Sequence, residues 1–161
     1  MKSKTLKKYI FKFLIYLLFF NFSFSSFANQ NSEFPKSEIS IISTKYKKQF
    51  KFNVDVADNF LSRKNGLQFK KKLKKNEGML FIWEFEDHRY FWMKNTKLAL
   101  DIIFINANFE IVDIFYGAKP FNLMTITSNK KAKYVLELNE GIFKNLNLMI
   151  GDKLILKKIK K

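Results

Sequence analysis

The chain has 161 residues, a formal net charge of +16 and no cysteine. This length fits a single domain, and the missing thiols exclude disulfides, a cysteine nucleophile and a lipid attached to cysteine. Arginine supplies only Arg63 and Arg89 among the 30 basic residues, and no nucleic-acid-binding module is recognisable, so the positive charge does not predict a nucleic-acid partner.

The first 28 residues have the layout of a secretory signal peptide. "MKSKTLKK" is basic and free of acids, a short apolar block follows, and small residues stand at Ser26 and Ala28. Cleavage after Ala28 would leave a periplasmic or secreted chain of residues 29–161, with a charge of +11 because five lysines precede the cut. The alternative is an uncleaved segment, residues 9–28, that anchors the protein in the inner membrane.

Residues 29–49 are predicted to be a flexible lead-in that can contain a first strand, and residues 50–161 a single β-rich domain. Asp58 is the predicted N-cap of a short helix over Asn59–Asn65. The charged segment 70–78, "KKKLKKNEG", is expected to be a solvated connection, and the less favoured alternative is a membrane-surface patch.

Six short strands are predicted from apolar periodicity, and the stretch "RYFWMKNT" can form a seventh. They lie at residues 50–56, 79–85, 98–106, 110–116, 133–138 and 152–159, with the seventh at 89–96. A second short helix or a turn is predicted at 139–148, and Asn residues in "NANF" suit the left-handed conformation of a tight hairpin. Strands this short, joined mostly by tight turns, predict a mainly β domain, a small barrel or sandwich with one or two short helices.

Five segments, "VADNFLSRKNGL", "NEGMLFIW", "FWMKNTKLALDIIFI", "YVLELNEG" and "IGDKL", occur in an order that resembles the bacterial and archaeal family called domain of unknown function 192. The resemblance runs from about Phe50 to Leu156 and implies a compact, mainly β, often exported domain with no established activity. Three positions depart from the family pattern: Ala99 replaces a proline, Asn108-Phe109 replaces Asp-Gly in a hairpin, and Lys70 replaces an arginine. The last change removes a guanidinium group that could clamp an anion.

The inventory of reactive side chains excludes several mechanisms. One histidine, His88, and no cysteine do not make a typical zinc site, and no glycine-rich phosphate loop is present, so neither metal nor cofactor is predicted. Asp101 lies in an apolar strand and must be paired or hydrogen-bonded. Its partner is either an arginine or the backbone, in a structural role, or the same pair belongs to a ligand pocket.

Trp92, Lys94, Asn95 and Thr96 place an apolar ring next to hydrogen-bonding groups, as a saccharide or small anionic ligand requires. The alternative is that Trp92 packs in the core while Asn95 and Thr96 hold the following turn. Glu137 is expected to face solvent or a cross-strand lysine.

We therefore expect an exported, non-enzymatic module that binds a ligand or an envelope partner. The predicted site consists of Arg63, Trp92, Lys94, Asn95 and Asp101. The alternative from another class is an envelope enzyme, a carbohydrate-acting hydrolase that uses Asp101 as acid or base. A third alternative is a purely structural domain, which a fully buried Trp92 would favour. Contact with a membrane is expected only through an uncleaved signal segment.

Overall fold

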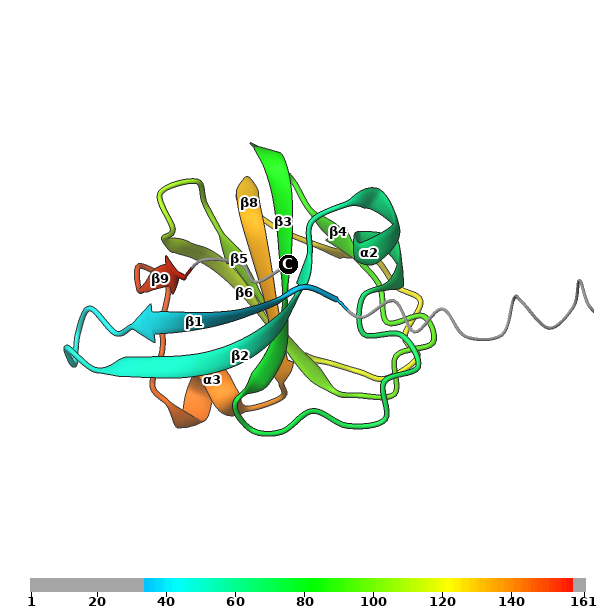
Figure 1. Cartoon of the computed structure of the whole chain (residues 1–161), viewed down its shortest axis with the longest axis horizontal. Helices are drawn as coiled ribbons and strands as arrows, with labels where there is room; N and C mark the ends of the chain where they lie inside the picture. Colours follow the sequence, from blue (N-terminus) through cyan, green and yellow to red (C-terminus); the bar gives the residue numbers. More distant parts are fainter. Residues whose placement is uncertain (1–33, 158–161) are drawn as a thin grey trace, which may run out of the picture. The chain divides into compact units, whose positions relative to one another are not determined.

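The computed structural model describes residues 34–157, which form one mainly β unit (Figure 1). The predicted signal segment, residues 1–28, and the end of the last predicted strand, residues 158–159, lie outside the described residues. Within the part of the chain that is described, no helix is long and apolar enough to cross a membrane.

The predicted mainly β fold with one or two short helices is confirmed, and the described residues form two helices. The described residues form nine strands where the sequence predicts six or seven, because one strand lies in the lead-in segment and another is only two residues long. The elements are β1 (Lys36–Ile42), β2 (Gln49–Ala57), α2 (Phe60–Asn65), β3 (Glu77–Asp87), β4 (Tyr90–Phe91), β5 (Leu100–Ile105), β6 (Ile111–Ala118), β7 (Ile126–Thr127), β8 (Ala132–Asn139), α3 (Ile142–Asn145) and β9 (Lys153–Leu156).

Seven strands form one curled sheet in the order β6-β5-β8-β3-β2-β1-β9, and β4 and β7 form a separate two-stranded ribbon. All neighbours in the large sheet are antiparallel except β2 and β3, which run parallel because α2 and a long loop carry the chain back between them (Figure 1). The sheet curls into a half-barrel, and its two edges meet at the bridge between Glu110 and Lys153 and at backbone hydrogen bonds from Ile111 to Asp152 and from Leu154 to Phe109.

Apolar side chains pack on both faces of this sheet. The core inside the curl joins residues of both edge regions, among them Ile39, Ile41, Ile105, Ile111, Leu136 and Leu154. On the outer face a second core contains Met79, Phe81, Ile102, Phe104, Val135 and the covering residues Leu67 and Met93. All six residues of β5 are buried, which explains why "LDIIFI" shows no alternation of apolar and polar residues.

Two details of the sequence prediction are corrected, one by side-chain hydrogen bonds at the start of α2 and one by a backbone dihedral angle in the β5–β6 hairpin. The N-cap of α2 is Asn59 and not Asp58, because the Asn59 side chain accepts from the Ser62 backbone N–H while the Ser62 hydroxyl accepts from Asn59. In the β5–β6 hairpin the left-handed residue is Phe109 (φ 59°), not an asparagine. Its ring stacks on Tyr134 at 4.9 Å, and this contact holds the unusual conformation.

Candidate functional site

A pocket of about 340 Å³ lies between the outer face of the sheet and the segments that cover it. The cover consists of α2 and the loop after it, β4 and the turn that follows. The lining residues are Phe60, Arg63, Lys64, Asn65, Gly66, Leu67, Gln68, Phe81, Trp83, Tyr90, Phe91, Trp92, Thr96 and Glu137. Aromatic side chains therefore dominate the walls, as is usual for sites that hold small organic molecules.

Trp83 is the centre of the aromatic wall. Its ring stacks with Phe81 at 6.2 Å and meets Phe91 edge to face at the same distance, and Phe91 in turn contacts Phe104 at 6.1 Å. Such ring pairs add to the free energy of burial and restrict the orientation of each ring. This side of the pocket is consequently a packed surface that needs little rearrangement when a ligand enters.

Two guanidinium groups also pack on Trp83. The guanidinium carbon of Arg63 lies 5.3 Å from the ring centre and that of Arg89 lies 4.4 Å away. Arg63 donates to the Ile82 carbonyl at 2.8 Å, and Arg89 donates to the Ala132 carbonyl at 2.8 Å. Burial lowers the pKa of Arg89, so this group is partly desolvated. Arg63 lines the pocket and places a fixed positive charge on its wall.

The stretch from Arg89 to Thr96 forms a strand only at Tyr90 and Phe91, which pair with β7. Met93 is buried in the outer core, whereas Tyr90 and Trp92 are more than half exposed, at 68% and 52%, and line the pocket. One side of the stretch thus belongs to the core and the other to the pocket.

The turn after Trp92 is tied to the loop after α2. Asn95 adopts a left-handed conformation (φ 56°), its backbone carbonyl accepts from the Phe69 N–H at 2.9 Å, and its side chain donates to Gln68 at 3.1 Å. Gln68 and Thr96 line the pocket beside this junction. Asn95 therefore positions pocket residues and is not itself among them.

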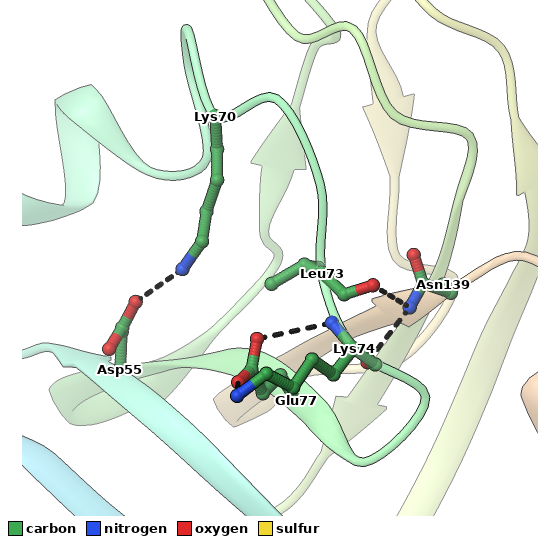
Figure 2. Close-up of polar contacts among 6 residues, drawn as sticks. All are labelled: Asp55, Lys70, Leu73, Lys74, Glu77 and Asn139. Atoms are coloured by element: carbon green, nitrogen blue, oxygen red, sulfur yellow. Dashed lines mark hydrogen bonds and ion pairs between the residues drawn. The ribbon is translucent and has the colours of Figure 1, made fainter.

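The later part of the same loop, from Lys70 to Lys74, is anchored to the sheet (Figure 2). Lys70 forms an ion pair with Asp55 at 2.7 Å, and the Asn139 side chain donates to the carbonyls of Leu73 and Lys74. The Lys74 backbone N–H donates to the Glu77 carboxylate and is the main cause of a lowered Glu77 pKa. These bonds hold the charged segment against the sheet. They also limit the movement of residues 65–68 just before it, which form one wall of the pocket.

Glu137 lies on β8 in the outer face of the sheet, between Met79 on β3 and Ile102 on β5. It is 5% exposed and lines the pocket. Its carboxyl group has no hydrogen-bonding or ionic partner among residues 34–157, and burial raises its pKa to about 8. At neutral pH this side chain is therefore an uncharged acid that can both donate and accept a hydrogen bond.

The expectation that Glu137 faces solvent or a lysine is wrong, because β8 is a central strand that is covered on both faces. Trp83 and Glu137 were not predicted as site residues. An acid between two leucines in "YVLEL" was the available signal, since a strand with apolar residues on both faces leaves no solvent side for it.

The structure brings two of the five predicted site residues, Arg63 and Trp92, into the pocket lining. Lys94 lies beside it, with its ammonium group 5.3 Å from the Trp92 ring centre. Asp101 lies elsewhere, 1% exposed, and accepts from the backbone N–H groups of Gly117, Gly141 and Phe143 at 3.1, 3.0 and 3.3 Å. This is the backbone-bonded alternative, in which Asp101 ties β5 to β6 and to the start of α3.

A cavity of about 370 Å³ on another part of the surface contains Lys70, Asp55 and Glu77. There Lys70 pairs with Asp55, and Glu77 is bonded to Lys74. Because these charges are already neutralised within the protein, the pocket above Glu137 is the better candidate for a functional site.

Known proteins resemble most of this chain. The family model DUF192, described as "Uncharacterized ACR", matches residues 41–156. A UPF0127 protein of Pyrococcus furiosus is 32% identical over 113 residues, which cover 66% of this chain and 89% of that protein. A UPF0127 protein of Pyrococcus horikoshii is 29% identical over 107 residues, which cover 63% and 84% of the two chains.

Two solved structures have the same fold. A candidate transcription regulator of Sinorhizobium meliloti 1021 is 31% identical with a TM-score of 0.75, and the match covers 77% of this chain and 95% of that one. A protein of unknown function from Novosphingobium aromaticivorans is 28% identical with a TM-score of 0.74, covering 79% and 89%. These two solved chains consist almost entirely of the matched region.

Proposed function

This chain belongs to the DUF192 family, and we propose that it is a non-enzymatic binding domain whose pocket holds a small ligand with a flat apolar part and an anionic or hydroxyl group. The observation that carries the proposal is the unpartnered, buried carboxyl group of Glu137 at an aromatic-lined pocket. The side chain is largely buried and reaches the pocket without a partner in the domain, so its carboxyl group can bond with a ligand that enters the pocket.

The charges around the pocket favour an anionic group over a cationic one. Arg63 supplies a positive charge, and the neutral acid of Glu137 can donate a hydrogen bond to a carboxylate, phosphate or hydroxyl oxygen. Trp83, Tyr90 and Trp92 provide flat surfaces on which a ring can stack. For an anionic ligand the affinity should fall as the pH rises through about 8, because ionised Glu137 repels it.

The same geometry gives less support to a hydrolase. Asp101, the acid that such an enzyme would use, is saturated by three backbone N–H groups and does not line the pocket. Glu137 is the single acid among the described residues of the lining, whereas glycoside hydrolysis commonly needs two carboxyl groups. Nor does the description of the Sinorhizobium neighbour transfer readily, since both arginines here pack on Trp83 and donate to backbone carbonyls.

Export to the periplasm or beyond is part of the proposal. Its support is the order of a basic, an apolar and a small-residue segment in residues 1–28. Cell fractionation with an antibody against the folded domain tests it, and recovery of the full-length chain in the cytoplasm would contradict it.

Ligand binding can be measured directly, because both tryptophans of the chain line the pocket. Residues 29–161 are titrated with benzoate, phenyl phosphate and N-acetylglucosamine while tryptophan fluorescence and two-dimensional amide NMR spectra are recorded. We expect saturable changes in fluorescence, with NMR shifts concentrated at the amides of the pocket, in α2 and the loop after it, in β4 and the Met93–Thr96 turn, and around Trp83 and Glu137 on the sheet.

Two substitutions of the same residue separate its roles. Glu137→Gln keeps a neutral donor and acceptor and should bind with an affinity that no longer depends on pH. Glu137→Leu removes the bond and should weaken binding by roughly 10- to 100-fold. Glu84→Gln, at an exposed position of β3, is the control. Unchanged affinity in Glu137→Leu, or no response to any probe, would reject the proposed pocket function.

A further inference from the structure

Large apolar side chains are exposed on the segments that cover the outer face of the sheet. We call six of them the aromatic rim: Phe69, Tyr90, Trp92, Phe121, Leu123 and Met124, which are 52–74% exposed. Contiguous apolar surface of this kind is uncommon on a soluble domain and usually marks an interaction site.

Hydrogen bonds show that these segments lie side by side. The Phe69 N–H donates to Asn95 at 2.9 Å, the Phe121 N–H donates to Thr96 at 3.1 Å, and the Met93 N–H donates to Asn122 at 2.9 Å. The turn after Trp92 is thus bordered by Phe69 on one side and by Phe121 on the other. In Figure 1 the same segments lie around α2 and β4, away from the tip of the β1–β2 hairpin.

Two rings of the rim are held in an unusual backbone conformation. Phe69 and Phe121 have φ values of 62° and 59°, in the left-handed region that bulky residues rarely adopt. Phe109 shares this conformation, but its ring packs on Tyr134, whereas Phe69 and Phe121 are 69% and 58% exposed. Packing within the domain therefore does not explain why phenylalanine stands at these two turns, where asparagine or glycine would be less strained.

The segments that carry the rim hold charged side chains of one sign. Residues 59–76, 88–100 and 119–131, which include every rim residue, contain no aspartate or glutamate. They contain several exposed lysines, among them Lys64, Lys94, Lys97 and Lys119. An apolar surface on segments whose charged side chains are all basic fits a partner that combines negative charge with an apolar interior.

We infer that the aromatic rim docks on an anionic lipid bilayer, with its rings at the level of the headgroups and the surrounding lysines on the lipid phosphates. Tryptophan, tyrosine and phenylalanine favour this interfacial zone, and each lysine near an anionic surface adds attraction. Leu123 and Met124 favour a bilayer over single-stranded nucleic acid, because aliphatic side chains enter acyl chains but offer bases no ring to stack on.

Flotation with lipid vesicles tests the inference, using residues 29–161 so that the apolar N-terminal segment does not contribute. The vesicles contain either phosphatidylcholine alone or three parts phosphatidylcholine to one part phosphatidylglycerol. We expect binding to the anionic vesicles and little to the neutral ones. Phe69→Asn combined with Phe121→Asn should lower the bound fraction at least tenfold without loss of folding, because asparagine tolerates both turns.

Matched variants at the opposite end of the domain serve as controls. Tyr46→Asn removes an exposed ring, and Lys48→Glu with Lys51→Glu changes the net charge as much as Lys97→Glu with Lys119→Glu. Only Lys97→Glu with Lys119→Glu should reduce vesicle binding, by about tenfold or more. Equal binding by the rim variants and the controls would overturn the inference, as would displacement of the vesicles by a single-stranded oligonucleotide that binds the rim more tightly. None of these substituted residues lines the pocket, so the result is independent of ligand binding.

Discussion

Replacing Glu137 by glutamine should change how the stability of the domain depends on pH. Burial raises the pKa of this carboxyl group from 4.5 to about 8. Below pH 4.5 the acid is protonated in both the folded and the unfolded chain. Between pH 4.5 and about 8 the unfolded chain releases the proton while the folded chain keeps it, so the free energy of unfolding falls as the pH rises.

The size of the effect follows from the shift. Each pKa unit corresponds to about 1.4 kcal/mol. The shift from 4.5 to about 8 therefore lowers the free energy of unfolding by roughly 5 kcal/mol once the pH is above 8. Between pH 5 and pH 7 the wild-type chain should lose about 3 kcal/mol relative to Glu137→Gln, which has no proton to release. Urea unfolding of residues 29–161, followed by tryptophan fluorescence at pH 5, 6 and 7, measures this difference.

The difference between the free energies of unfolding of wild type and Glu137→Gln at each pH isolates the contribution of Glu137. The remaining titratable groups are common to both proteins, so their contributions cancel. Glu84→Gln is the control, because it makes the same change from acid to amide at an exposed position outside the pocket. If the stability curves of wild type and Glu137→Gln run parallel from pH 5 to pH 7, the carboxyl group is ionised in solution and the description of a neutral acid in the pocket is refuted.

Three further predictions test the structure. Asp101→Asn should lower the free energy of unfolding by about 2–4 kcal/mol in urea titrations, because an amide cannot accept all three backbone N–H groups. Asn59→Ala should cost about 1 kcal/mol and Asp58→Ala less than about 0.5 kcal/mol in the same assay; the reverse order would mean that Asp58 caps α2. Phe69→Asn should leave thermal stability unchanged or raise it, whereas Phe109→Asn, at the same φ, should lower it because the stacking on Tyr134 is lost; equal effects would contradict the account of the exposed ring.

Local periodicity was sufficient to predict most of the sheet. Alternation in Phe50–Val56 matches β2, and the apolar runs at 98–106 and 133–138 match β5 and β8 to within a few residues. The parallel pairing of β2 with β3 was not predictable in this way, since it joins residues separated by α2 and a long loop. The predicted strand at 89–96 is short because Asn95 turns the chain, and asparagine alone does not distinguish a turn from a strand.

The site was predicted less completely than the fold, because it too depends on contacts between residues that are far apart in the sequence. Arg63 was identified because arginine is rare in this lysine-rich chain, and Trp92 because Lys94, Asn95 and Thr96 place hydrogen-bonding groups next to its ring. Trp83 looked like an ordinary strand residue, because its role depends on guanidinium groups from α2 and from the start of β4. A pocket roofed by irregular loops leaves no periodic pattern in any one segment.

Three buried acids in residues 34–157 show why Glu137 requires a functional explanation. Asp101 accepts three backbone N–H bonds, and Asp152 accepts from Thr44 and Met149, where it fixes the turn at Gly151. The fold thus provides several donors for each of these two carboxylates, whereas the Glu137 carboxyl group, in a side chain that is 5% exposed, reaches the pocket with no partner among residues 34–157. Glutamine or leucine would avoid the cost of burying an unpartnered acid, so a glutamate facing a pocket between two tryptophans is best explained by a partner that enters from outside.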